Sequence, residues 1–133
     1  MLEEFLGIAA AEPPFTLESF MSACVDRDAV RRDILRQMRD VPILLSPVSS
    51  TAAFRHGAGN YRSLDPHNYR DTMRYCQWLN LTGFPGLTIP MGQSPDKLPI
   101  SVQLIGRPFE EEQLFKVGQV LESERGVFPL PPI

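Results

Sequence analysis

Adjacent hydroxyl groups are the first side chains in this sequence that could carry out nucleophilic chemistry. Ser49 and Ser50 lie between Pro47–Val48 and Thr51–Ala52. A serine nucleophile needs a base to activate it and backbone donors to hold the oxyanion, and no glycine here provides a tight turn of such donors. We therefore interpret the pair as part of a polar loop.

Imidazole groups are the second candidates. His56 and His67 are eleven residues apart and could act as a base or as metal ligands, with Asp65 or Asp71 as the orienting carboxylate. Isolated histidines in a loop usually do neither. The sequence therefore assigns no catalytic residue to this chain.

Ammonium and thiol groups complete the set. Lys97 lies in an expected turn and Lys116 beside the apolar face of the last expected helix, so both are expected to be solvated. Cys24 and Cys76 have no cysteine or histidine at metal-ligand spacing. No metal site, no cofactor and no disulfide is expected.

The composition is that of one globular unit. The chain has 133 residues, of which 43% are hydrophobic and 22% charged, and its net charge is −3. We interpret residues 1–133 as a single domain or domain fragment. Basic residues form no block, which argues against a nucleic-acid partner. The N-terminus lacks the basic residues of a secretory signal, and no apolar run approaches the roughly 20 residues of a membrane span, so a cytoplasmic protein is expected.

A long amphipathic helix is predicted over residues 17–39, preceded by residues 1–15 that are irregular or a short helix. Thr16 is a suitable N-cap, and Pro42 ends the pattern. The charged side chains between Asp26 and Arg39 indicate a solvated, ion-paired face. The apolar stripe shifts near Asp26, which indicates either a bend or a second surface to cover.

Three short strands are predicted, at about 42–46, 86–90 and 100–105. The first is an apolar run without alternation, which is typical of a strand buried on both faces. Pro90 is expected to end the second strand. In the third, Gln103 is polar among apolar residues and needs a hydrogen-bond partner if it is buried.

Two further helices are predicted, at about 67–79 and 109–123, which gives an α/β fold with a short mixed sheet. Gly83 is suited to the left-handed turn that closes the first, and Pro108 with the carboxylates after it starts the second. Gly118 lets that last helix approach its neighbour closely. Residues 46–68 form a long loop of the kind that is usually functional, and residues 126–133 form an extended tail.

The order and spacing of one stretch carry a family resemblance. Asn80–Gly92 and Leu98–Gly106 resemble the pattern N-x-x-G-x-P-x-x-x-x-P-x-G, then L-P-x-G-x-Q-x-x-G, of amidase-signature enzymes, and Asp40–Pro47 resembles the strand that precedes it in that family. The similarity spans about 40–122. Lys97 and Ser101 stand where the family commonly has glycine, which leaves the local backbone there open.

The resemblance implies a C-terminal segment of an amidase, with a partial amidase-signature fold. The Gly/Ser-rich region that carries the family's two serines precedes the part that this chain resembles, and no such segment occurs here. The implied role is to provide sheet and one wall of the substrate cleft. Met73 aligns near an aspartate that holds the amide donor in the subunit that makes glutaminyl or asparaginyl tRNA. A neutral methionine there favours a neutral or apolar amide over glutamine, whereas a shifted alignment would bring Asp71 to that position.

Three functions remain open. The first is a truncated hydrolase segment that acts on carbon–nitrogen bonds of a small-molecule amide only with a parent or complementing catalytic half. The second is a non-catalytic remnant that binds a small molecule or a partner. The third is part of a glutamine-dependent amidotransferase subunit. A segment cut from a larger core should also expose strands and apolar helix faces, so either a homodimer or marginal stability of the chain alone is expected.

Overall fold

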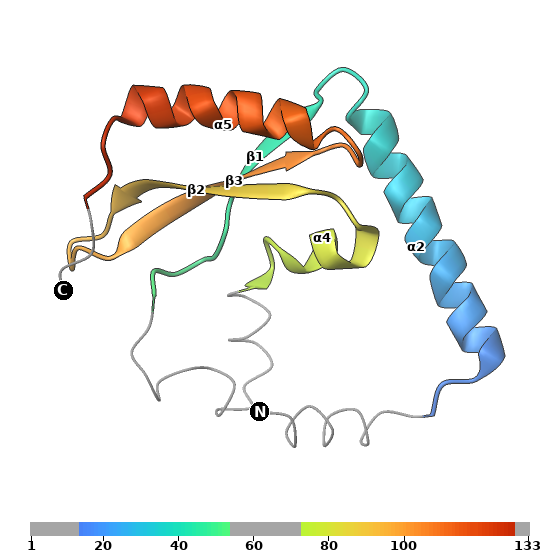
Figure 1. The fold of residues 1–133 in the computed structure, drawn as a ribbon. Coiled ribbons are helices and arrows are strands. Elements are labelled where there is room, and N and C mark those ends of the chain that lie inside the picture. Colours follow the sequence, from blue (N-terminus) through green and yellow to red (C-terminus); the bar gives the residue numbers. More distant parts are fainter. Residues whose placement is uncertain (1–13, 54–72, 130–133) are drawn as a thin grey trace.

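A computed structural model describes residues 14–53 and 73–129 of the protein (Figure 1). Three helices and three strands follow one another in the described residues. Their order is α2 (Leu17–Gln37), β1 (Ile43–Pro47), α4 (Gln77–Thr82), β2 (Gly86–Gln93), β3 (Pro99–Gly106) and α5 (Glu111–Arg125). The α/β prediction is confirmed, and the three strands lie where the sequence predicts them.

The sheet has the order β1-β3-β2, and both neighbouring pairs are antiparallel. The mixed sheet expected from the sequence is therefore not found among the described strands. β2 and β3 are consecutive and joined by a short turn, which forces them to be antiparallel. β1 also pairs antiparallel with the central strand, so β1 and β2 run in the same direction on opposite sides of β3.

β1 is an edge strand in the described residues, which corrects the expectation that it is buried on both faces. Leu45 in its middle is 65% exposed. The strand buried on both faces is β3, in which Gln103–Gly106 are all buried. β3 takes the centre because it pairs with a strand on each side.

Each face of the sheet carries its own core. On one face Leu114 of α5 packs with Ile89 and Leu104. A Cβ on Gly118 would lie 2.7 Å from Leu87 Cδ2, which confirms the close approach predicted for α5. On the other face Ile105 packs with Met38 at the end of α2, with Leu79 of α4 and with Phe84, which lies between α4 and β2.

Helix α2 begins as predicted and ends two residues earlier. Thr16 and Ser19 form a reciprocal capping box. Arg27 pairs with Asp28 at 2.9 Å and Arg36 pairs with Asp33, all on exposed side chains, which confirms the ion-paired face. No residue within the helix is buried. In its second half Ile34 and Leu35 pack against the core that contains Met38, whereas Leu17, Phe20 and Met21 at its start are exposed.

Helix α4 ends at Gly83, which adopts the predicted left-handed conformation with φ 71°. The helix continues three residues beyond the predicted Leu79, and within it Thr82 Oγ1 donates to the carbonyl of Trp78 at 2.7 Å. The first part of the helix predicted at 67–79 lies outside the described residues. Residues 1–13 and 130–133, for which an irregular start and a tail are expected, lie outside them as well.

Two prolines behave differently from the prediction. β2 passes through Pro90 to Gln93, because β2 is an edge strand and its register shifts between Pro90 and Gly92. Pro108 lies in a turn closed by the Glu110 N–H and the Arg107 carbonyl at 3.1 Å, with Phe109 at φ 67°. Helix α5 therefore begins at Glu111, two residues later than expected.

Candidate functional site

A row of polar side chains crosses the sheet on the face opposite α5. Gln103 of the central strand is in register with Ser46 of β1 on one side and Thr88 of β2 on the other. Side chains of residues in register point to the same face of an antiparallel sheet. The row therefore combines two hydroxyl groups and one carboxamide on one face of the sheet.

Gln103 is the buried centre of this row, being 5% exposed. Its Nε2 donates to Ser46 Oγ and to the carbonyl of Tyr75, each at 3.4 Å. The prediction that a buried Gln103 needs partners is confirmed. Because Tyr75 lies directly before α4, the bond also ties that segment to the sheet.

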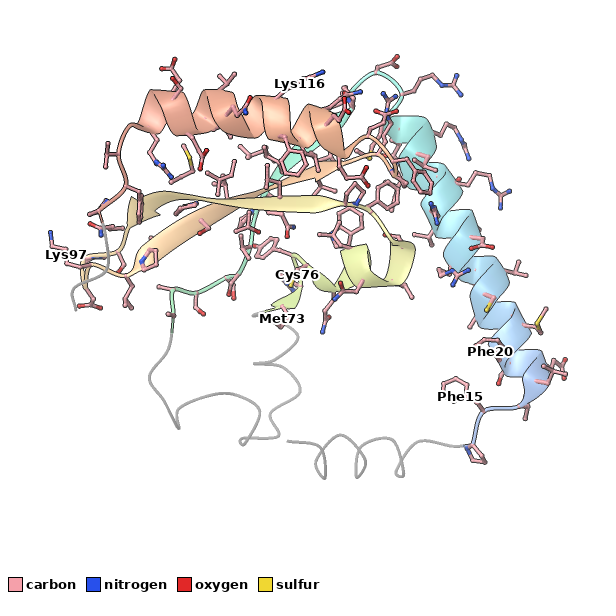
Figure 2. The ribbon with its side chains drawn as sticks, viewed as in Figure 1. Phe15, Phe20, Met73, Cys76, Lys97 and Lys116 are labelled. Atoms are coloured by element: carbon pink, nitrogen blue, oxygen red, sulfur yellow. The ribbon has the colours of Figure 1, made fainter. Side chains whose placement is uncertain are left out.

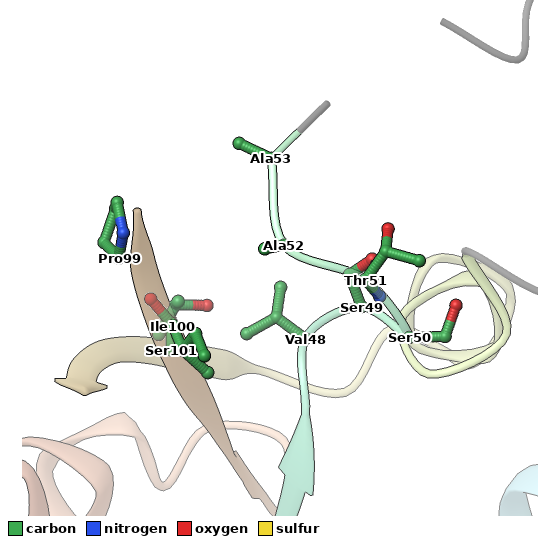
Figure 3. A pocket seen from close by; sticks show the side chains of 10 residues that line it. Val48, Ser49, Ser50, Thr51, Ala52, Ala53, Pro99, Ile100 and Ser101 are labelled. Carbon is green, nitrogen blue, oxygen red and sulfur yellow. Dashed lines mark hydrogen bonds between the residues drawn. The ribbon is translucent and has the colours of Figure 1, made fainter. Parts of the chain in front are cut away.

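A hollow of about 310 Å³ opens beside the polar row (Figure 3). Figure 3 shows the loop after β1 running beside the start of β3. The lining residues are small, hydroxyl-bearing or apolar: Val48, Ser49, Ser50, Thr51, Ala52, Ala53, Thr88, Pro99, Ile100 and Ser101. The volume is at the lower end of the range of small-molecule sites. None of the described lining residues carries a charge, so this part of the hollow suits an uncharged group.

The serine pair lies in this hollow without the partners that a nucleophile requires. Ser49 Oγ accepts a hydrogen bond from the backbone N–H of Thr51 at 3.3 Å. Neither a histidine nor a lysine is among the lining residues. The two serines can therefore bind a substrate group, but no described residue of the hollow raises their nucleophilicity.

Met73 lies close to the polar row in sequence but outside the hollow's lining. It is half-buried, and its carbonyl accepts from the N–H of Cys76 at 3.1 Å and from Cys76 Sγ at 3.4 Å. Figure 2 places both side chains together beneath the sheet. Tyr75, in the same turn, contacts Gln103. A role for Met73 in binding substrate stays a prediction.

The remaining candidates are separate from the hollow. Lys97 lies at the β2–β3 turn and Lys116 on the outer side of α5, and both are exposed, as expected (Figure 2). His56, His67, Asp65 and Asp71 lie outside the described residues. Within the described part of the chain, no group of three or more histidine, cysteine or carboxylate side chains could hold a metal ion. None of the described helices is long and apolar enough to cross a membrane.

Sequence reasoning found Gln103 but missed the other members of the site. Thr88 and Ser101 lie on the same face as Gln103, and the hollow adds Pro99 and Ile100. A signal was present in β3, where polar Ser101 and Gln103 alternate with apolar residues. The partner positions on β1 and β2 depend on strand register, which no local pattern specifies.

The chain matches known proteins over most of its length. The family model described as Amidase matches residues 8–115. A glutamyl-tRNA(Gln) amidotransferase subunit of Azorhizobium caulinodans is 40% identical over 111 residues, which are 80% of this chain and 22% of the relative. The protein of the same name from Anaeromyxobacter is 33% identical over 128 residues, or 96% of this chain and 25% of the relative.

Solved structures share the fold. The Thermotoga maritima glutamyl-tRNA(Gln) amidotransferase subunit superposes with a TM-score of 0.72 at 30% identity, covering 84% of this chain and 25% of that one. A 6-aminohexanoate cyclic dimer hydrolase superposes with a TM-score of 0.69 at 22% identity, over the same shares of the two chains. The chain thus spans about a quarter or less of the length of the relatives that it matches.

Proposed function

Because the chain belongs to the amidase family, we propose that it is the C-terminal part of an amidase-type hydrolase domain. It acts on carbon–nitrogen bonds of small-molecule amides only together with a catalytic half that carries the nucleophile. The chain itself contributes strands of the sheet and one wall of the substrate cleft. The proposed unit is one domain fragment, located in the cytoplasm.

The observation that carries this proposal is the uncharged hollow beside the polar row. Ser46, Thr88 and Gln103 bring hydrogen-bonding groups to one face, and the described residues that line the hollow next to them include no charged side chain. Such a surface can position an amide by hydrogen bonding and shape. It cannot by itself supply the proton transfer that amide hydrolysis requires.

Reconstitution tests the proposal. The chain is assayed on simple amides after mixing with the part of an amidase-family relative that the match does not cover. We expect turnover from the mixture and none from either part alone. A mixture that forms a stable complex but leaves every amide intact would contradict the hydrolase function.

The second candidate is that this chain forms part of a glutamine-dependent amidotransferase subunit. The names of the relatives at 33–40% identity favour it. In that case the partner would be the rest of an amidotransferase rather than a free-standing hydrolase half. Met73 argues for the hydrolase, since a thioether cannot pair with the ammonium group of glutamine. The preferred substrate of the reconstituted protein, glutamine or a neutral amide, separates the two.

A non-catalytic remnant is the alternative from another class. It would bind a ligand or partner through the surface that a catalytic half covers in the relatives. The DNA upstream of Met1 discriminates between these possibilities. A reading frame there that encodes a Gly/Ser-rich serine pair supports the hydrolase segment, whereas unrelated sequence supports the remnant.

A further inference from the structure

The two edges of the sheet differ in how they are protected. On the β2 edge, Pro90 has no N–H to donate, and the register shifts directly after it. The Pro90 carbonyl already accepts from Arg125 Nη1 at 2.6 Å. Prolines, bulges and side-chain caps of this kind prevent another strand from pairing. The second half of the β2 edge is therefore protected.

The β1 edge carries a proline only at its last residue, Pro47, and no bulge in its register. Among the described strands none pairs with its outer side. The residues Ile43–Ser46 keep their N–H and C=O groups, and none of them is charged. In an antiparallel pair only alternate residues bond to the neighbour, so the others present their backbone groups to the open edge. β1 is thus able to accept a further strand.

The sequence of β1 is also that of an interior strand. Ile43, Leu44 and Leu45 form an apolar run without alternation. Leu44 packs on the core that contains Met38, whereas Leu45, on the other face, is 65% exposed. A strand that is apolar on both faces belongs inside a covered sheet. The pattern and the open edge therefore point to the same missing neighbour.

An apolar groove connects β1 with helix α2. It has a volume of about 430 Å³ and is lined by Ile34, Gln37, Met38, Val41, Leu44 and Trp78. Val41 beside it is 53% exposed. The groove therefore extends the uncovered surface from the edge of the sheet to the helix.

The apolar side of α2 continues beyond the groove. Leu17, Cys24, Arg31 and Met38 are seven residues apart, which places them along one side of the helix. Met38 is 1% exposed, Cys24 is intermediate and Leu17 is 78% exposed. Phe20, 56% exposed, lies in the uncovered half. We call the uncovered half of α2, the groove and the open edge of β1 the α2–β1 surface.

We propose that the α2–β1 surface is the docking site for the catalytic half of an amidase-type domain, a partner that adds a strand to β1 and fills the groove with apolar side chains. This rests on the proposed function. The family match runs from residue 8 to residue 115 and so includes both α2 and β1. Three quarters or more of each relative lies outside the match. A second copy of this chain is the competing occupant.

The test uses the part of the Thermotoga maritima amidotransferase subunit that lies outside the matched quarter, produced as a tagged polypeptide. That protein's own matched quarter, supplied separately, is the positive control. We expect capture of the wild-type chain, at least tenfold weaker capture of Leu45→Lys, and unchanged capture of Val120→Lys. The two substitutions are matched, because Leu45 and Val120 are 65% and 60% exposed and Val120 lies on α5.

A single-chain chimera provides a readout that does not depend on how tightly two separate polypeptides from different organisms bind each other. In it, this chain replaces the matched quarter of the Thermotoga maritima protein. We expect Leu45→Lys to lower the Tm of the chimera by at least about 3 °C. The same change in the isolated chain should leave Tm unchanged, as should Val120→Lys in the chimera.

The outcomes separate this inference from the proposed function. Capture that is weakened by Val120→Lys but not by Leu45→Lys would place docking on α5, which overturns the inference and leaves the function standing. A homodimer that Leu45→Lys dissolves, without capture or a Tm effect in the chimera, would make a second copy the occupant. If the chain is not captured although the positive control is, and if Leu45→Lys does not change the Tm of the chimera, both the inference and the proposed function are overturned.

Discussion

The side-chain amide of Gln103 donates to the carbonyl of Tyr75 at 3.4 Å, across 28 residues of sequence. The bond joins the central strand to the segment before α4. Gln103→Leu removes the donor and leaves that carbonyl without this partner, so we expect a loss of about 1–3 kcal/mol in the free energy of unfolding. Urea denaturation measures it. Gln119→Leu makes the same change at an exposed position of α5 and should cost less than about 0.5 kcal/mol.

Gly118 sets the distance between α5 and the sheet. A Cβ there would meet Leu87 Cδ2 at 2.7 Å and Ile89 Cδ1 at 3.2 Å. Gly118→Val should therefore destabilise the protein by about 1–3 kcal/mol through overpacking. Gly92→Val is the control, since a Cβ at Gly92 has no neighbour within 4 Å. Equal unfolding midpoints for the two variants would show that α5 does not press on β2 in this way.

Lys97 adopts φ 65° in the turn between β2 and β3. The left-handed conformation costs a residue with a side chain about 1–2 kcal/mol, and glycine avoids this cost. Part of the gain is lost because glycine makes the unfolded chain more flexible. Lys97→Gly should therefore raise Tm by about 2–5 °C. Lys116→Gly, the same change inside exposed α5, should lower Tm instead. A fall in Tm for Lys97→Gly would mean that the turn is not strained.

Met73 tests the preference for a neutral amide. In the reconstituted protein, Met73→Asp should raise kcat/KM for glutamine relative to a neutral amide by about tenfold, because a carboxylate near the substrate can pair with its ammonium group. Gln77→Asp adds the same charge at an exposed position of α4 and should leave the ratio unchanged. An unchanged ratio for both variants would remove Met73 from the binding site.

Local signals predicted the elements of this fold well. Thr16 starts α2 because its side chain accepts from the Ser19 N–H, and Gly83 ends α4 because glycine tolerates its positive φ. Both depend on residues within a few positions of each other. Local rules were wrong where tertiary position decides, as at Pro90, which an edge strand tolerates beside a bulge.

The candidate site could be predicted only in part. The polarity of Gln103 indicated a need for partners, but Ser46 is 57 residues away and becomes a partner only through strand register. Exposed strands were expected of a segment cut from a larger core, but not that β1 would be one of them, because its apolar run matches an interior strand. That mismatch between the pattern of β1 and its position is the strongest sign that the described sheet is part of a larger one.

Amide hydrolysis by the purified chain alone tests the central claim most directly. The claim is that this chain shapes an amide site without supplying the chemistry. We expect no turnover of simple amides by the chain alone, and turnover that appears only when a catalytic half is added. Hydrolysis that stays with the purified chain, at a rate proportional to its concentration, would contradict the account.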